Sequence, residues 1–405
     1  MPIRPPQIVI AGAGPAGMTL AYLLASNGVA VRVLERHPDF EREFRGELVQ
    51  PSSVAALAKL GILSALSARG LAIPNVDRRM FVGARRQVMR AVTTGGEKGM
   101  LISQPGFLQL LHEACSRFPT YRMDFATRVT DTIVEDGRVV AVKTRSSAGE
   151  DRVDADLFVV CSGRGSLLRK SAGVEVEAFL QPADALWLRF DLSDVPDALP
   201  KGVDVHMYGA GVVTVTSPTT RSRLQIAFSA PGDLAALRKD LPELRRRLIP
   251  TLPEALRAII DRKLQPDTEW QVLKVTVDRL KSWNVPGLLF LGDAAHTMSP
   301  SGGQGLNIAI RDAIVAANHL TEAHLAGAPV DAALLDRIQQ EREPEVIAAQ
   351  AGQIRAGTMV LKPVAVLHIA FTILGFMLAL VMRFKKPAGE AVVEVRYPVP
   401  LPTAV

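Results

Sequence analysis

Apolar positions in the first third of the chain follow the periods of an alternating α/β fold. A β-branched run at residues 7–11 ends in glycines, residues 16–27 repeat with helical spacing, and residues 29–34 form a second apolar run. Further amphipathic helices are predicted at 51–60 and 106–117. The pattern therefore predicts a strand–helix–strand unit at the N-terminus.

The middle of the chain changes to the two-residue period of strands. Strands are predicted at residues 127–134, 139–145, 156–161, 186–191, 203–208, 212–217, 224–229, 270–277 and 288–291. Asp136-Gly137 is a hairpin turn between the first two. Residues 234–259 have helical spacing with a break near Pro250, and a long helix is predicted from 305 to 325. The strands after residue 186 predict a sheet that forms one wall of a cavity.

The segment 364–382 is a long apolar run, VAVLHIAFTILGFMLALVM, whose only strongly polar member is His368. Its length makes it a transmembrane candidate. Three hypotheses stay open: a membrane-spanning helix, an interfacial anchor, or a buried helix that covers the substrate cavity. The flanking Arg383, Lys385 and Lys386 suit anionic headgroups and equally suit a solvated helix end.

Composition narrows the class of protein. The 405 residues are 48% hydrophobic and 22% charged, as in an ordinary globular protein, and the net charge of +6 is scattered rather than clustered. Scattered charge argues against a nucleic-acid partner. Two cysteines exclude a disulfide framework, and no signal peptide is evident, so we expect a cytoplasmic protein. The seven histidines show no metal-binding spacing.

The first chemical motif is a glycine-rich turn between the first strand and helix. It consists of Gly12, Ala13, Gly14, Pro15, Ala16 and Gly17. The three glycines allow a tight turn, close approach of a pyrophosphate, and close helix–strand packing, while the helix N-terminus attracts phosphate. Glu35, with Arg36 beside it, ends the second strand where a ribose would be bound. The motif predicts an adenine dinucleotide without separating FAD from NAD.

The second motif follows the strand at 288–291. It reads GDAAHTMSPSGGQGLNIAIRDA, from Gly292 to Ala313. Asp293, at the strand end, suits a sugar-like hydroxyl, and the glycine run leads to a helix start that stabilises an anion. His296 has two interpretations: a catalytic base, or a residue that orients this loop.

Together these motifs resemble the single-component FAD-dependent monooxygenases of the para-hydroxybenzoate hydroxylase fold, over roughly the first 325 residues. The resemblance implies that Asp293 binds the ribityl chain, that Pro300 lies beside the reactive face of the flavin, and that Gly305 and Leu306 present N–H groups to its ring. The further cofactor contacts that it implies are Arg45, Gln104, Val129, Gly163 and Asn307.

A third family motif is imperfect. The chain reads Ser162-Gly163-Arg164-Gly165-Ser166-Leu167-Leu168-Arg169, in which Gly163, Ser166 and Arg169 match the family. Ser162 replaces an aspartate that the family associates with FAD and the pyridine nucleotide. A serine can form hydrogen bonds but carries no charge, so this departure bears on how NAD(P)H is engaged.

The resemblance implies a discontinuous Rossmann-like FAD-binding domain (1–174 and 281–330), a mixed-sheet substrate domain (175–280) and a C-terminal helical region (331–405). It also implies that NADPH or NADH reduces FAD and that O₂ then forms a C4a-hydroperoxide, which hydroxylates or epoxidises a hydrophobic or aromatic small molecule. The candidate pocket residues are Trp187, Phe190, His206 and Tyr208. Two alternatives are a flavin-dependent prenyl-chain reductase and a non-catalytic, membrane-associated FAD-binding protein.

Overall fold

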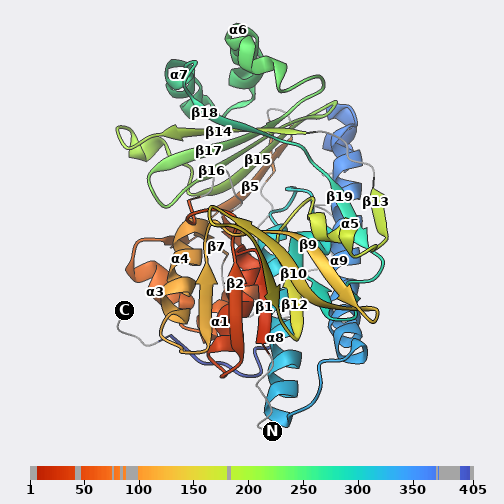
Figure 1. The fold of residues 1–405 in the computed structure, drawn as a ribbon. Coiled ribbons are helices and arrows are strands. Elements are labelled where there is room, and N and C mark those ends of the chain that lie inside the picture. Colours follow the sequence, from red (N-terminus) through yellow and green to blue (C-terminus); the bar gives the residue numbers. More distant parts are fainter. Residues whose placement is uncertain are drawn as a thin grey trace.

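A computed structural model gives the architecture of the chain (Figure 1). The residues that it describes are 7–41, 47–74, 77–82, 85–87, 99–179, 184–370, 373 and 393–401. It consists of two main sheets with helices on their outer faces, so the predicted α/β class with a mixed-sheet insert is confirmed.

The first main sheet has six strands in the order β20-β21-β12-β1-β2-β8. The strands are β1 (Gln7–Ala11), β2 (Ala30–Leu34), β8 (Tyr121–Asp124), β12 (Leu157–Val160), β20 (Asn284–Val285) and β21 (Leu288–Phe290). All neighbouring pairs are parallel except β20–β21. The central strands β1 and β12 are apolar and almost wholly buried, as parallel strands covered on both faces must be.

Helices pack around this sheet. They are α1 (Pro15–Ala25), α2 (Pro51–Lys59), α3 (Ile62–Ala68), α4 (Gln104–Cys115), α5 (Leu167–Ser171) and α8 (Gly305–Ala326). Helix α1 packs against both α4 and α8. Buried apolar residues of the sheet and of these helices form one continuous core. Cys115 and Cys161 lie in it with free thiols, as small buried side chains.

The second main sheet has seven strands in the order β18-β14-β17-β16-β15-β5-β6. The strands are β5 (Asp77–Val82), β6 (Arg85–Gln87), β14 (Ala185–Asp191), β15 (Gly202–Gly209), β16 (Val212–Pro218), β17 (Arg223–Ser229) and β18 (Glu269–Leu273). Strand β5 comes from a distant part of the sequence and pairs in parallel with β15. The predicted substrate domain did not include β5 and β6.

Three small sheets, β11-β10-β9, β13-β19-β22 and β3-β7-β4, complete the described strands. They comprise β3 (Leu48–Val49), β4 (Ala72–Pro74), β7 (Met100–Ile102), β9 (Arg128–Glu135), β10 (Arg138–Ser146), β11 (Gly149–Asp154), β13 (Val176–Phe179), β19 (Val277–Leu280) and β22 (His296–Thr297). Strands β9 and β10 form the predicted hairpin, whose turn residues Asp136 and Gly137 both have positive φ.

Short helices cover the outer face of the seven-stranded sheet (Figure 1). They are α6 (Leu241–Leu248) and α7 (Glu254–Lys263), with the 3-10 turns η2 (Ala236–Lys239) and η3 (Ile249–Thr251). Their buried leucines pack on Leu186, Leu188 and Phe190 of β14. The opposite face of this sheet is therefore left to line the space between the two main sheets.

The C-terminal part begins with the long helix α9 (Ala332–Val360) and continues as helix at residues 364–370. Leu367 is buried against Val82 and Met207, whereas Val366 and Ile369 are exposed. Residues 371–372 and 374–392, which include most of the apolar segment 364–382, lie outside the described residues. Within the described part, no single helix could span a membrane by length and composition; the bent pair α2–α3 passes that test together.

Candidate active site

A cavity of about 1030 Å³ lies between the two main sheets. The carboxyl ends of β1, β2 and β12 form its floor, together with the loop before α8. The inner face of the seven-stranded sheet forms the opposite wall, and the C-terminal half of α9 closes one side. Most of the cofactor residues predicted from the sequence line it: Gly12, Gly14, Pro15, Ala16, Glu35, Arg36, Gln104, Val129, Gly163, Asp293, Gly305 and Leu306.

The first glycine motif has the geometry of a phosphate cradle. A Cβ at Gly12 would lie 2.6 Å from the Cys161 carbonyl oxygen, and one at Gly17 would lie 2.0 Å from that of Gly12, so neither position accepts a side chain. Gly14 has open space toward the cavity, and no side chain caps the N-terminus of α1 that follows it. Free N–H groups thus face the cavity, as a dinucleotide pyrophosphate requires. Gly17 serves packing and does not line the cavity.

The Glu35 carboxylate holds this loop from the end of β2. It accepts hydrogen bonds from Ala13 N at 2.7 Å and from His37 N at 3.0 Å, and the residue is buried. Glu35 therefore fixes the glycine loop while also lining the cavity. Arg45, the other predicted contact of this region, lies outside the described residues.

The second motif forms the η4 turn (Gly292–Ala294), strand β22 and a glycine loop that ends at the start of α8. Gly302 and Gly303 have φ values of +84° and +63°, which other residues rarely adopt. No side chain caps the N-terminus of α8, so its first N–H groups are free to meet an anionic ring edge. Asp293 and Pro300 both line the cavity. This arrangement fits FAD.

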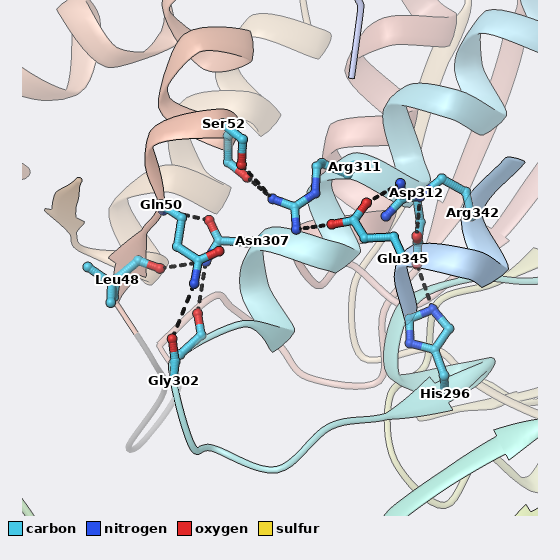
Figure 2. Close-up of polar contacts among 12 residues, drawn as sticks. Leu48, Gln50, Ser52, His296, Gly302, Asn307, Arg311, Asp312, Arg342 and Glu345 are labelled. Carbon is cyan, nitrogen blue, oxygen red and sulfur yellow. Dashed lines mark hydrogen bonds and ion pairs between the residues drawn. The ribbon is translucent and has the colours of Figure 1, made fainter. Parts of the chain in front are cut away.

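Asn307 fixes this loop from behind instead of lining the cavity. Its amide nitrogen donates to the Leu48 and Gly303 carbonyls, both at 2.9 Å, and its oxygen accepts from Gln50 N at 2.7 Å (Figure 2). The Gln50 amide donates in turn to the Gly302 carbonyl at 3.3 Å. The sequence predicts that Asn307 contacts the cofactor directly. In the structure its side chain instead holds the loop of the second motif in position.

His296 points away from the cavity. It is buried, and its Nε2 lies 2.8 Å from Asp312 Oδ2, while Arg342 Nε donates to the other carboxylate oxygen at 2.9 Å (Figure 2). Burial alone would raise the pKa of Asp312, but the charges and hydrogen bonds of His296 and Arg342 outweigh it and hold that pKa at about 2. Of the two interpretations of His296, this geometry matches an orienting residue.

A buried ion-pair network extends from Asp312 to α2 and α9 (Figure 2). Arg342 also pairs with Glu345, which pairs with Arg311. The Arg311 guanidinium donates to the Ser52 hydroxyl at 3.0 Å. The network joins α8, α9 and α2 directly behind the loop of the second motif, so the C-terminal helix takes part in holding the site.

The third motif is tied to the second through Arg169. Its guanidinium donates to the Ala294 carbonyl at 2.7 Å and pairs with Asp278 at 2.9 Å. Ser162, which replaces the family aspartate, donates to the Ser166 hydroxyl at 2.8 Å. The sequence motif includes Arg169 but indicates no role for it. In the structure Arg169 links the loop of the third motif to the loop of the second.

Side chains alternate between the two faces of each strand, so only some of the predicted pocket residues face the cavity. Trp187 on β14 lines the cavity, but Phe190, His206 and Tyr208 do not. Phe190 packs under α6 and α7, His206 stacks on Phe81 with ring centroids 4.2 Å apart, and the Tyr208 hydroxyl donates to the Thr251 carbonyl. On β15 the odd-numbered residues face inward, so even-numbered His206 and Tyr208 face outward. These three are therefore not pocket residues.

Glu47 lines the cavity beside Leu48 and Gln104 and was not singled out from the sequence. Burial raises the pKa of Glu47 to about 7, although Arg189 and Arg221 lower it in part. Its Oε2 is buried with no hydrogen-bond partner among the described residues. No sequence signal could have found it, because its burial depends on β14 and the β16–β17 turn.

Comparison with known proteins decides the family. The family model for an FAD binding domain matches residues 6–352. The chain is 30% identical over 378 residues to a 6-methylpretetramide 4-monooxygenase from Streptomyces rimosus, covering 88% of this chain and 86% of that protein. The chain belongs to the FAD-dependent monooxygenases. The resemblance seen in its motifs is thereby confirmed, and a non-catalytic role is set aside.

Solved structures agree on the fold. Pseudomonas aeruginosa PqsL in complex with 2-aminobenzoylacetate has a TM-score of 0.76 and 21% identity, over 88% of this chain and 96% of that one. The p-nitrophenol 4-monooxygenase PnpA from Pseudomonas putida has a TM-score of 0.75 and 21% identity, over 95% and 98%. Both support the two-sheet arrangement around the cavity.

Proposed function

We propose that this FAD-dependent monooxygenase uses NADPH or NADH and O₂ to hydroxylate or epoxidise a hydrophobic aromatic molecule. The observation that carries the proposal is the cavity itself, because one wall fits FAD and the facing wall is largely apolar. FAD, once reduced, supplies the electrons that activate O₂ for transfer of one oxygen atom. The named activity of another relative, a 3-(3-hydroxy-phenyl)propionate/3-hydroxycinnamic acid hydroxylase that is 25% identical over 88% of this chain, supports an aromatic substrate.

The residues of this chain position the reactants and exclude water. The N-terminus of α1 would hold the pyrophosphate, Asp293 the ribityl chain, and the N-terminus of α8 the ring. Val205 and Met207 on β15 would contact the substrate opposite Pro300, since all three line the cavity. An apolar wall keeps water from the reacting centre, and loop rigidity comes from Asn307 and Arg169.

Product mass spectrometry under ¹⁸O₂ tests this reaction. The purified, FAD-loaded protein is supplied with NADPH or NADH and a panel of hydroxylated polycyclic aromatics and polyenes. We expect one labelled oxygen atom in the product of at least one aromatic substrate. A gain of two hydrogens in place of oxygen would instead identify a prenyl-chain reductase.

The cofactor part of the proposal has its own test. Asp293→Ala should release FAD more readily, because the change removes a carboxylate acceptor from the cavity wall while leaving the glycine loops intact. Retention of FAD is measured from flavin absorbance after dialysis. Unchanged retention would contradict the role proposed for Asp293.

A further inference from the structure

The cavity face of the seven-stranded sheet is polar at one side and apolar at the other. The side chains of β15 and β5 that the structure describes at the cavity are apolar: Val203, Val205, Met207 and Met80. The polar side chains that this sheet presents are Gln271, Trp187, Gln225, Ser229 and Ser217, on β18, β14, β17 and β16. Among the described side chains, a ligand that lies along the sheet therefore meets hydrogen-bonding groups on β18, β14, β17 and β16 and apolar groups on β15 and β5.

Two of these polar groups are buried donors without partners. The amide nitrogen of Gln225 and the indole nitrogen of Trp187 form no hydrogen bond within the described part of the chain. Gln225 is only 5% exposed. A buried N–H group without an acceptor destabilises the protein, and both of these belong to side chains that line the cavity. An oxygen acceptor on a bound molecule would satisfy these donors.

The sheet register places the two donors side by side. Trp187 pairs with Ala227, and Gln225 lies two positions along β17, opposite Arg189. Trp187 and Gln225 are thus diagonal neighbours on the same face, a separation that large side chains bridge. One planar molecule against this face can contact both donors.

We propose that Gln225 and Trp187 form the recognition site for an acceptor oxygen, a carbonyl or a phenolate, on a flat aromatic substrate whose apolar edge lies against β15 and β5. The proposal rests on the proposed monooxygenase function and adds the orientation of the substrate. A buried site built to hydrogen-bond an oxygen rejects the analogue that lacks it, because its donors are then left unpaired. Gln225 and Trp187 are therefore specificity-determining residues.

Ligand pairs that differ by one oxygen test this orientation. Xanthone with xanthene probes a carbonyl, and 2-naphthol with naphthalene probes a hydroxyl or phenolate. Binding to the FAD-loaded protein is measured by equilibrium dialysis and by perturbation of flavin absorbance, without turnover. We expect the wild type to bind the oxygenated member of at least one pair about tenfold more tightly, the factor given by roughly one good hydrogen bond.

Gln225→Met and Trp187→Phe should each reduce that preference to about threefold or less, since each removes one donor. Binding of the oxygen-free member should change little. Thr216→Val is the matched control: the Thr216 hydroxyl is also buried without a described partner, but it lies on β16 outside the cavity lining. Flavin content and melting temperature show that each variant is folded.

A preference that survives both substitutions overturns the proposal, as does a wild type that binds no member of either pair or shows no preference. Loss of preference in Thr216→Val would also overturn it, by showing a general effect of the sheet. These outcomes differ from failure of the proposed reaction. If the protein shows the expected binding preference but inserts no labelled oxygen into any substrate, the recognition site is supported and the proposed reaction is contradicted.

Discussion

The two walls of the cavity are built from different parts of the polypeptide. The flavin-side wall presents backbone: glycine loops and the uncapped N-termini of α1 and α8. The facing wall presents side chains from six strands of the seven-stranded sheet, β5 among them. The first wall suits a cofactor that many proteins share, because main-chain N–H groups bind phosphate whatever the neighbouring residues. The second wall suits a substrate, because any side chain in it can change while the sheet persists.

This difference predicts different tolerance to substitution. The first glycine loop fails when a Cβ is added at Gly12 or Gly17, since neither position has room for it. A side-chain wall changes its ligand while its fold stays intact. The substitutions below probe that contrast, beginning with the largest expected effect.

Gly17→Ala should have the largest effect. The new Cβ would lie 2.0 Å from the Gly12 carbonyl oxygen, so either α1 or the glycine loop must move. We expect a loss of more than roughly 5 kcal/mol in the free energy of unfolding, together with loss of bound FAD. Gly352→Ala is the control, because nothing lies within 4 Å of its Cβ position on α9. Retention of FAD by Gly17→Ala, in protein of normal stability, would refute close packing as the reason for this glycine.

Arg342→Met breaks the buried network behind the second motif. It leaves the carboxylates of Asp312 and Glu345 without one of their cations. A buried ion pair that loses one partner costs roughly 3–5 kcal/mol, which denaturant unfolding would measure. Arg337→Met, on the exposed face of the same helix, should cost almost nothing. Equal effects of the two changes would show that the network contributes little.

Glu47→Gln should change stability only at higher pH. Burial raises the pKa of Glu47 to about 7 from its ordinary value of 4.5. Below pH 4.5 the carboxyl is protonated in both states and has no pH-dependent effect. As the pH rises from 4.5 to 7 the unfolded chain loses this proton first, so the native state loses stability.

The variant removes this loss, so it should exceed the wild type by roughly 2–3 kcal/mol at pH 8 and match it at pH 4. Thermal unfolding of the FAD-free proteins at the two pH values measures the difference. Glu41→Gln is the matched control, since Glu41 is exposed. A stability gain that is the same at both pH values would contradict the raised pKa.

The same contrast explains what could be predicted from the sequence. The loops of the flavin-side wall depend on residues close together in the chain, such as Gly12 to Gly17, and their chemistry follows from a motif. The facing wall depends on register and on distant partners. Alternation identifies two faces of β15 but not which one turns inward, so His206 and Tyr208 were placed on the wrong side. Nothing local indicates that β5 joins this sheet.

Tyr208→Phe has the smallest expected effect and tests the facing of β15 directly. The Tyr208 hydroxyl donates to the Thr251 carbonyl at 2.9 Å on the outer face, between the sheet and η3. Its removal should cost about 1 kcal/mol of stability, the net value of one hydrogen bond. Ligand binding and NAD(P)H oxidation should stay unchanged, because the side chain does not reach the cavity. Trp187→Phe, on the inner face of the same sheet, should show the reverse: altered ligand preference with little change in melting temperature. If Tyr208→Phe altered ligand affinity while leaving stability intact, the assignment of inner and outer faces would have to be exchanged.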